Sequence, residues 1–474
     1  MATTTLSGMD SLNCPFTIID ETIKERPAGE VLSRWSDANI GHPAIIIRPN
    51  TEDHIVSAIH FARQNGLSLL PASGGHGAFV SIDSQTAYLD LKAFKSIQLD
   101  KSTGTVRVGA GTTTGEFVEI LAAEGYYTPV PNSDAVSVIG AILGGGNSAQ
   151  NGQHGFMVDS TISLGVITAE GKHREVSSSS TGDELALYHA LCGAGHGLGV
   201  ITSATIKIYP LANLHLSDGK IWTRTLVFPP PALDLVADVF SAFQPTDGRL
   251  SFSVTFARSP PGTPAAGKPV IVMSATFYGP SSAAREAAPL LFDEALVQRA
   301  VKADTVMVPC ADANKGLAKV DVHGGFKSIT SARLHAVPAD YIREVFKLWV
   351  DITDALPDAG RSVVVLTKFD TSVMQDNGRE EAHAGKFLEA RDRGVTVMVP
   401  AWAVTTESYE RMMESVDAFM EVVRRGQAGK VWSFPNGMKV RADLGELFGG
   451  ERVAELKRLK GLFDPEGVFW SPYV

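Results

Sequence analysis

Two glycine-rich stretches, each following a short apolar run, constrain this chain more than any other feature. Residues 71–77 read PASGGHG and residues 140–147 read GAILGGGN. Glycine lets backbone N–H groups approach a ligand closely, because no Cβ holds the ligand away. The first stretch also places His76 within that backbone. These loops predict a site for a flat, anionic ligand, and a dinucleotide fits this description.

Length and composition favour a globular protein with more than one domain. The chain has 474 residues, of which 44% are hydrophobic and 20% charged. A single core rarely extends over so many residues, so we expect two domains. The net charge of -10 offers phosphates no long-range attraction, so we expect no nucleic-acid partner.

The N-terminal residues lack the cationic start and apolar core of a signal peptide, and no apolar run approaches the roughly 18 residues of a membrane span. We therefore expect a cytoplasmic protein without a membrane partner. The cysteines are Cys14, Cys192 and Cys310, and they lie far apart in the sequence. This spacing argues against a disulfide framework and against a zinc site, so no metal is expected.

The first 210 residues predict alternating strands and helices. A strand over 44–49 precedes a helix that starts near Asn50 and ends at Asn65-Gly66, and residues 67–70 then lead into the first glycine loop. Further elements follow: strands over 105–108 and 161–168, a hairpin return over 172–176, and a helix over 115–124. A third glycine-rich turn, 192–199, closes this region.

The pattern changes after Pro210. Apolar residues recur with period two in five runs: 220–228, 250–257, 270–278, 362–369 and 395–399. Helical stretches at 339–356 and 408–425 alternate with these runs, and 259–267 has the composition of an exposed loop. The pattern predicts an antiparallel sheet backed by helices. We interpret it as a substrate-facing platform.

The order of these motifs resembles the flavin-binding domain of the vanillyl-alcohol oxidase and p-cresol methylhydroxylase superfamily, in its berberine-bridge-enzyme-like branch. Gly155 and Asp159 follow the second glycine stretch at the spacing of that family, and residues 457–469 resemble its terminal motif. The resemblance implies an α+β fold: a two-subdomain FAD-binding domain over 1–210, an antiparallel-sheet substrate domain backed by helices over 211–425, and a return to the first domain over 426–474.

The resemblance also implies a covalent cofactor. In that family the histidine equivalent to His76 is bonded to the 8α-methyl group of FAD, which holds the flavin and raises its redox potential. Many relatives carry a second link through a cysteine eleven residues before the glycine triplet, where this chain has Ser133. Serine cannot form that thioether, so we expect one covalent bond, through His76 only. Ala72 stands where relatives commonly have arginine.

Further residues are expected around the cofactor by the same resemblance. Those of the glycine-rich loops and their surroundings are Ser73, Gly74, Gly75, Gly77, Ala78, Ser133, Ser137, Val138, Gly140, Gly144, Gly145, Gly199 and Ile201. His154 is expected beside the flavin ring, where stacking competes with catalysis as its role. Asn436 is expected to form a hydrogen bond near the flavin. Phe434 and Gly437 replace two tyrosines of the family motif, so the usual base is missing.

Other candidates for acid and base chemistry carry weaker signals. His196 lies in a glycine loop, and Lys368, His323, Tyr409 and Glu407 lie in the platform domain. Solvated or core positions explain most of them, so no catalytic residue is assigned.

Other glycine-loop cofactors fit poorly. Residues 193–199 lack the GxGxxG order of nicotinamide sites, and residues 109–115 have no convincing ribose-binding acid after them. No glycine run continues as GK followed by serine or threonine, so a P-loop is excluded.

Three functions remain at this point. The first is an FAD-dependent oxidase that takes a hydride from a small secondary-metabolite substrate and is reoxidised by oxygen, because the sequence shows no second cofactor motif. The second is a cyclase on the same fold, with FAD structural or auxiliary. The third is a flavin-holding protein without turnover. A small molecule is the expected partner, and a monomer or homodimer the expected assembly.

Overall fold

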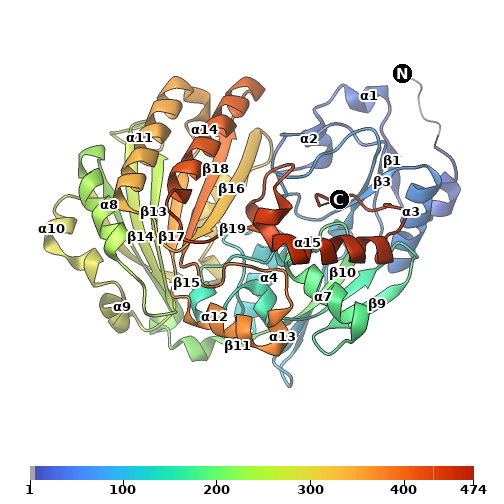
Figure 1. Cartoon of the computed structure of the whole chain (residues 1–474), viewed down its shortest axis with the longest axis horizontal. Helices are drawn as coiled ribbons and strands as arrows, with labels where there is room; N and C mark the ends of the chain where they lie inside the picture. The colour runs from blue at the N-terminus through green and yellow to red at the C-terminus, as the bar shows by residue number, and fades with distance from the viewer. Residues whose placement is uncertain (1–5, 431, 474) are drawn as a thin grey trace.

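The computed structural model describes residues 6–430 and 432–473. Two parts lie side by side (Figure 1). One part contains the small sheets of the N-terminal half, and the other contains a large sheet with helices along one face.

The first small sheet has the strand order β1-β2-β4-β3, with β1 at Phe16–Ile18, β2 at Ile45–Ile47, β4 at Thr86–Asp90 and β3 at Ser68–Ala72. Strands β2, β4 and β3 run parallel. Helix α3 (Glu52–Gln64) connects β2 to β3; the Thr51 side chain caps its first turn, and Gly66 with φ of +62° follows its end. Strand β3 therefore delivers the chain directly into residues 73–78.

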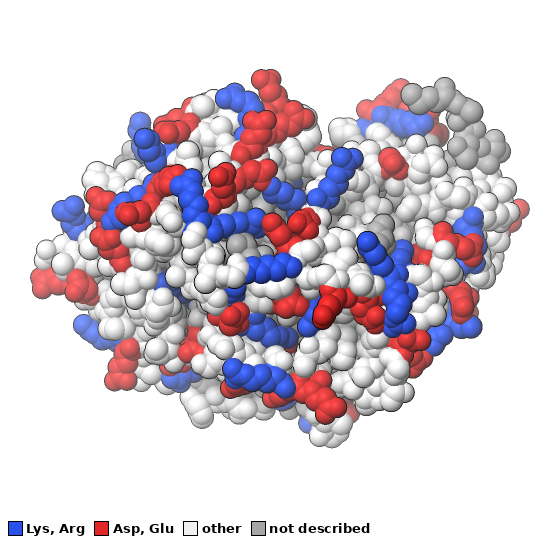
Figure 2. Space-filling model, viewed as in Figure 1, with Lys and Arg blue, Asp and Glu red and all other residues white. Residues whose placement is uncertain are grey.

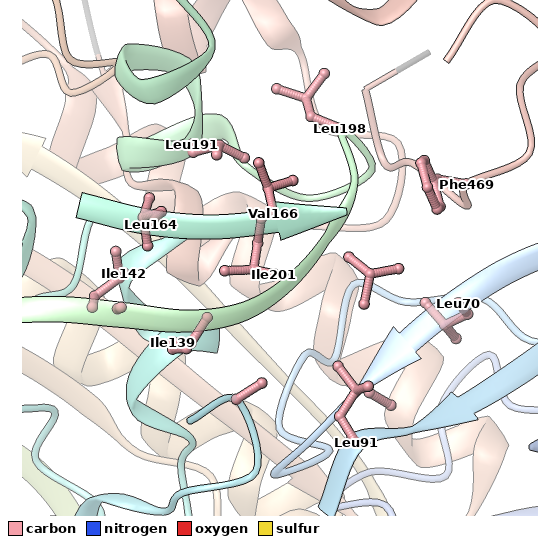
Figure 3. Packing of buried hydrophobic residues seen from close by; sticks show 14 of the residues in the cluster. Leu70, Leu91, Ile139, Ile142, Leu164, Val166, Leu191, Leu198, Ile201 and Phe469 are labelled. Carbon is pink, nitrogen blue, oxygen red and sulfur yellow. The ribbon is translucent and has the colours of Figure 1, made fainter. Parts of the chain in front are cut away.

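The second small sheet is antiparallel, in the order β5-β6-β10-β8-β9. Its strands are β5 (Ile97–Asp100), β6 (Thr105–Gly109), β10 (Val200–Lys207), β8 (Thr161–Ile167) and β9 (His173–Ser177). Helices α4 (Thr114–Ala123), α5 (Val138–Ile142) and α7 (Gly182–Ala194) connect its strands. Figure 3 shows Ile139, Ile142 and Val166 in the core that these elements share.

The large sheet has eight antiparallel strands in the order β15-β12-β14-β13-β17-β18-β16-β19. They are β15 (Lys302–Pro309), β12 (Lys220–Phe228), β14 (Pro269–Phe277), β13 (Leu250–Arg258), β17 (Val364–Lys368), β18 (Val395–Ala403), β16 (Phe326–Leu334) and β19 (Trp432–Ser433). Helices α8 (Leu233–Ala242), α11 (Ala339–Ala355) and α14 (Thr406–Arg424) pack on one face (Figure 1). Alternate residues such as Phe252, Val254 and Phe256 are fully buried there.

The predicted α+β fold and the antiparallel sheet backed by helices are confirmed. All five period-two runs are strands, and both long helices form within a few residues of their predicted ends. Strands β15 and β16 were not predicted from the pattern. Strand β19 still pairs with β16, so the large sheet continues beyond residue 425, where we expected the substrate domain to end.

The C-terminal segment returns to the first part through helix α15 (Leu444–Phe463). The buried carboxylate of Asp464 accepts hydrogen bonds from Lys460 Nζ at 2.6 Å, from Val468 N at 2.8 Å and from Phe469 N at 2.9 Å. These bonds set residues 468–470 beside Leu69 of β3, whose N–H donates to the carbonyl of Val468. The terminal motif therefore supports the strand that precedes His76.

Surface charges of both signs are intermixed on the face shown in Figure 2. Within the described residues, no helix combines the length and the apolar character that crossing a bilayer requires.

Candidate functional site

The loop after β3 offers a row of uncommitted backbone amides. Among the described residues, no N–H from Gly74 to Ala78 donates a hydrogen bond inside the protein. The loop is held from behind instead: Ser73 Oγ donates to the carbonyl of Ala110 at 2.5 Å, and Arg34 Nη2 donates to that of Gly77 at 2.8 Å. A Cβ on Gly74 would lie 2.8 Å from Ala135 O and Ser137 N, so only glycine fits there. The loop can therefore receive an anionic group.

His76 has an unusual environment. Its Nε2 is buried without a hydrogen-bond partner, and its ring stacks on Trp35 with centroids 5.4 Å apart and planes 20° apart. Burial, followed by the positive charges of His323, Lys327 and Arg34, lowers the pKa of His76 to about 3. The imidazole is therefore neutral at physiological pH, and a buried ring nitrogen without a partner is available to form a bond.

Two aromatic rings and two cations continue this stack into the second domain. Lys327 Nζ lies 4.9 Å from the Trp35 ring centroid and 4.0 Å from that of Trp402, and Arg361 lies 3.3 Å from the Trp402 centroid. Lys327 Nζ also donates to the carbonyl of Trp35 at 2.8 Å. Burial, and then Arg361, lowers the pKa of Lys327 to about 8. His76 is thus supported by a cation between two tryptophans.

A seam of hydrogen bonds joins residues 34–37 to residues 320–327. Trp35 Nε1 donates to Val320 O at 2.9 Å, Gly325 N donates to the Asp37 carboxylate at 2.7 Å, and Lys327 N donates to Ser36 Oγ at 3.0 Å. Further bonds run from Ser36 Oγ to Lys327 O and from Asp37 N to Gly325 O. The seam fixes second-domain residues against the loop that carries His76.

Ser133 occupies the position of the second covalent link in the resembling family. Its Oγ donates to the Asp321 carboxylate at 2.6 Å, and Asp321 belongs to the same seam segment. Asn314 Nδ2 donates to Pro131 O and to Asp134 Oδ1 nearby. The hydroxyl of Ser133 is thus already committed to the second domain.

The loop before α5 corrects one expectation. Ser137 caps α5 by accepting from Gly140 N at 3.0 Å, and Val138 N donates to Thr112 O at 3.2 Å. We expected Ser137, Val138 and Gly140 around the cofactor, but the amides of Val138 and Gly140 start the helix and close the adjoining turn, so neither is a free donor. The uncommitted amides lie in 74–78.

The glycine triplet is held by the C-terminal return. Asn436 Oδ1 accepts from Gly146 N at 2.9 Å, and Asn436 Nδ2 donates to Ala141 O at 3.0 Å. A Cβ on Gly144 would lie 2.3 Å from Asn436 Nδ2, and one on Gly145 would meet Leu388 and Phe434. Asn436 therefore shapes this loop with both ends of its amide. Its hydrogen bond near a flavin stays a prediction.

His154 lies in a cluster of aromatic rings. Its Nε2 is 2.9 Å from the Tyr127 hydroxyl, and its ring stacks on Tyr209 with centroids 4.0 Å apart. Burial, and then Lys207, lowers the pKa of His154 to about 4. The ring is therefore neutral, and the partners it bonds to and stacks on are side chains of this protein.

The remaining candidates divide between core and site. Ile201 is buried in the core beside Val166 (Figure 3), and a Cβ on Gly199 would lie 2.5 Å from that valine. Lys368 donates to the carbonyls of Ser241 and Phe243 at the end of α8, which is a structural role.

His323 was one of the weaker candidates for acid and base chemistry. Unlike Lys368, it belongs to the seam near His76. Trp35, Asp321 and Lys327 were missed in the sequence, because about 290 residues separate the two sides of the seam and neither side has a motif.

These observations fit FAD. A neutral histidine with a buried, unpartnered nitrogen lies among free backbone amides, and the glycine triplet has no room for a side chain. Within the described part of the chain, no group of three or more His, Cys, Asp and Glu residues could hold a metal ion.

Comparisons with known proteins agree with this geometry. A family model described as an FAD binding domain matches residues 43–177. The chain is similar to FAD-linked oxidoreductase hasG of Aspergillus fumigatus, with 24% identity over 93% of both chains. Two solved structures share the fold: BBE-like 1 of Physcomitrella patens (TM-score 0.80, 15% identity, 99% and 98% of the two chains) and berberine bridge enzyme (TM-score 0.75, 16% identity, 98% of each chain). The protein is an FAD-linked oxidoreductase with an FAD binding domain of the vanillyl-alcohol oxidase type and the berberine-bridge-enzyme-like fold.

Proposed function

We propose that the protein is an oxidase of a small secondary-metabolite substrate that holds FAD through one covalent bond, from His76. When bound, FAD supplies a ring that accepts a hydride and passes the electrons on to oxygen. The observation that carries the proposal is the buried, unpartnered and neutral nitrogen of His76. Ser133 supports a single link, since its hydroxyl is bonded to Asp321 and is no thiol.

The protein's own groups have distinct roles in this proposal. The amides of residues 74–78 bind the anionic part of the cofactor, and Trp35 fixes the plane of the His76 ring. Asn436 holds the glycine triplet in the shape that lines the ring. The second domain's sheet supplies the substrate wall. We propose that the enzyme acts in the cytoplasm as a monomer or homodimer, without a nucleic-acid or membrane partner.

The test is a visible spectrum of the purified protein, repeated after acid precipitation. We expect yellow colour to stay with the pellet in the native chain and to move to the supernatant in His76→Ala. His154→Ala is the matched control, because it removes another buried histidine and should keep the colour in the pellet. Flavin released by acid from the native chain contradicts the covalent bond, and failure to bind FAD after reconstitution contradicts the oxidase.

A cyclase is the second candidate, and one observation favours it. Phe434 lies beside Gly145 and Gly437 lies beside Ser331, and neither residue offers the hydroxyl of the family's tyrosines at these positions. Oxygen uptake distinguishes the two: an oxidase consumes oxygen as substrate disappears, whereas a cyclase forms its ring without oxygen consumption.

A further inference from the structure

The chain between strands β15 and β16 crosses from the second domain to the cofactor domain. We call residues 312–325 of this connection the strap; the structure describes all of them. Its longest element is a short 3₁₀ helix at Lys315–Val320, and Asn314 is its only buried residue. No apolar side chain of the strap is buried in a core, so hydrophobic burial contributes little to holding it in place. Hydrogen bonds must hold it instead.

The first anchor of the strap is the cofactor-domain segment 131–134. Ser133 Oγ donates to the Asp321 carboxylate at 2.6 Å. Asn314 Nδ2 donates to Pro131 O at 3.0 Å and to Asp134 Oδ1 at 3.1 Å. A hydrogen bond with an ionised acceptor is stronger than one between neutral groups, so the bond from Ser133 is the strongest candidate for a latch.

The second anchor is the cofactor-domain segment 34–37. Trp35 Nε1 donates to Val320 O at 2.9 Å, and Gly324 N donates to Arg34 O at 3.3 Å. The chain then turns into β16 through Gly324 and Gly325, which have φ of +81° and +78°. Glycine adopts such angles readily, so these two residues are a suitable hinge for the strap.

The two anchors lie on opposite sides of the loop with the uncommitted amides. Arg34 Nη2, from the second anchor, donates to the carbonyl of Gly77 at 2.8 Å. On the other side, a Cβ on Gly74 would lie 2.8 Å from Ala135 O, one residue beyond the first anchor. The strap is therefore bonded to both neighbours of the loop that can receive an anionic group.

The strap has fewer hydrogen bonds to its own domain. Arg361 Nη2 donates to Lys319 O at 2.8 Å, and Lys327 Nζ donates to Val322 O. The Asp321 carboxylate has no hydrogen bond or ion pair other than the one with Ser133 among the described residues. Asp321 therefore serves the contact between the two domains and no contact within its own domain.

We propose that the strap closes over bound FAD and that Ser133 and Asp321 are the positioning residues that keep it closed. FAD enters and leaves when the first anchor opens and the strap turns about Gly324 and Gly325. Ser133 thus contributes to cofactor retention without a bond to the flavin. This inference concerns retention of the cofactor, and it depends neither on the substrate nor on the covalent bond to His76.

The first test measures how fast FAD leaves a His76→Ala variant, by flavin fluorescence after dilution. Ser133→Ala and Asp321→Ala should each raise the dissociation rate roughly 10-fold, which corresponds to about 1.4 kcal/mol for a hydrogen bond to a charged group. Both changes remove the same bond, so the double variant should also show roughly 10-fold and not 100-fold. Asp312→Ala is the matched control, because Asp312 pairs with Lys315 inside the strap; it should change the rate less than about 2-fold.

The second test follows the strap itself, in the FAD-loaded chain with His76 intact. A protease that cuts after lysine can attack Lys315 and Lys319, whose side chains are exposed. Cleavage requires local opening, so Asp321→Ala should be cut there at least about 5-fold faster than the native protein, as measured by mass spectrometry of the fragments. Removing FAD from the His76→Ala variant should also speed the cleavage.

Four results would each overturn the inference. They are a change in dissociation rate below about 2-fold in both single variants, multiplying effects in the double variant, an equal effect of Asp312→Ala, and equal cleavage of the loaded native and Asp321→Ala proteins. The proposed function fails separately, through flavin that acid releases from the native chain.

Discussion

Removing the Asn436 side chain tests whether the C-terminal return shapes the glycine triplet. Its amide makes two hydrogen bonds, to Gly146 N at 2.9 Å and to Ala141 O at 3.0 Å, and both backbone partners are buried. Each bond contributes about 1 kcal/mol net, so Asn436→Ala should cost about 2 kcal/mol of loop organisation. If the cofactor binds only the organised loop, its Kd should rise by roughly 30-fold.

The assay needs a cofactor that can dissociate. We would therefore measure FAD affinity by flavin fluorescence in a His76→Ala background, with and without Asn436→Ala. Ser433→Ala is the matched control, because Ser433 lies in the same segment but bonds to Arg424 and Glu446 instead of the loop. A change in Kd below about 3-fold for Asn436→Ala, or an equal change for Ser433→Ala, would refute the reasoning.

Asn436→Asp provides a sharper comparison. The aspartate keeps the acceptor for Gly146 N but places an oxygen opposite the carbonyl of Ala141. We expect FAD affinity at least as poor as that of Asn436→Ala, because two acceptors then face each other. Native-like affinity would show that the bond to Ala141 O does not contribute.

Three further predictions concern stability and the covalent bond. Trp35→Ala should lower the acid-stable flavin fraction while Trp35→Phe largely retains it, as measured by pellet absorbance; equal retention would show that the stack on His76 is dispensable. Burial lowers the pKa of His196 to about 4, so below about pH 6.5 the unfolded chain binds more protons than the folded protein, and the free energy of unfolding falls toward pH 4. His196→Phe should reduce the slope of this free energy against pH by about 1.4 kcal/mol per pH unit, as measured by urea unfolding. An unchanged slope would contradict this prediction. Asp464→Ala leaves the Lys460 ammonium without its carboxylate and should destabilise the protein by about 3–5 kcal/mol, seen as a lower urea midpoint.

Much of the fold could be predicted because its elements are coded locally. Strand β13 alternates buried apolar and half-exposed polar residues, and α3 carries its own cap residue and terminal glycine. Such signals depend only on neighbours in the chain. The short strand β19 has no periodicity of its own and pairs only because β16 lies beside it, so its place in the sheet could not be predicted.

The same distinction between local and tertiary information applies to the site. The sequence by itself determined where the glycine loops and His76 stand, because the need for a bare backbone at residues 74–78 is local. Only the tertiary structure decided what surrounds them. Trp35 and Lys327 meet across the seam, and the amides of Val138 and Gly140 turned out to be used within the protein. Contacts between residues far apart in the sequence depend on how the domains pack, and no local pattern carries that information.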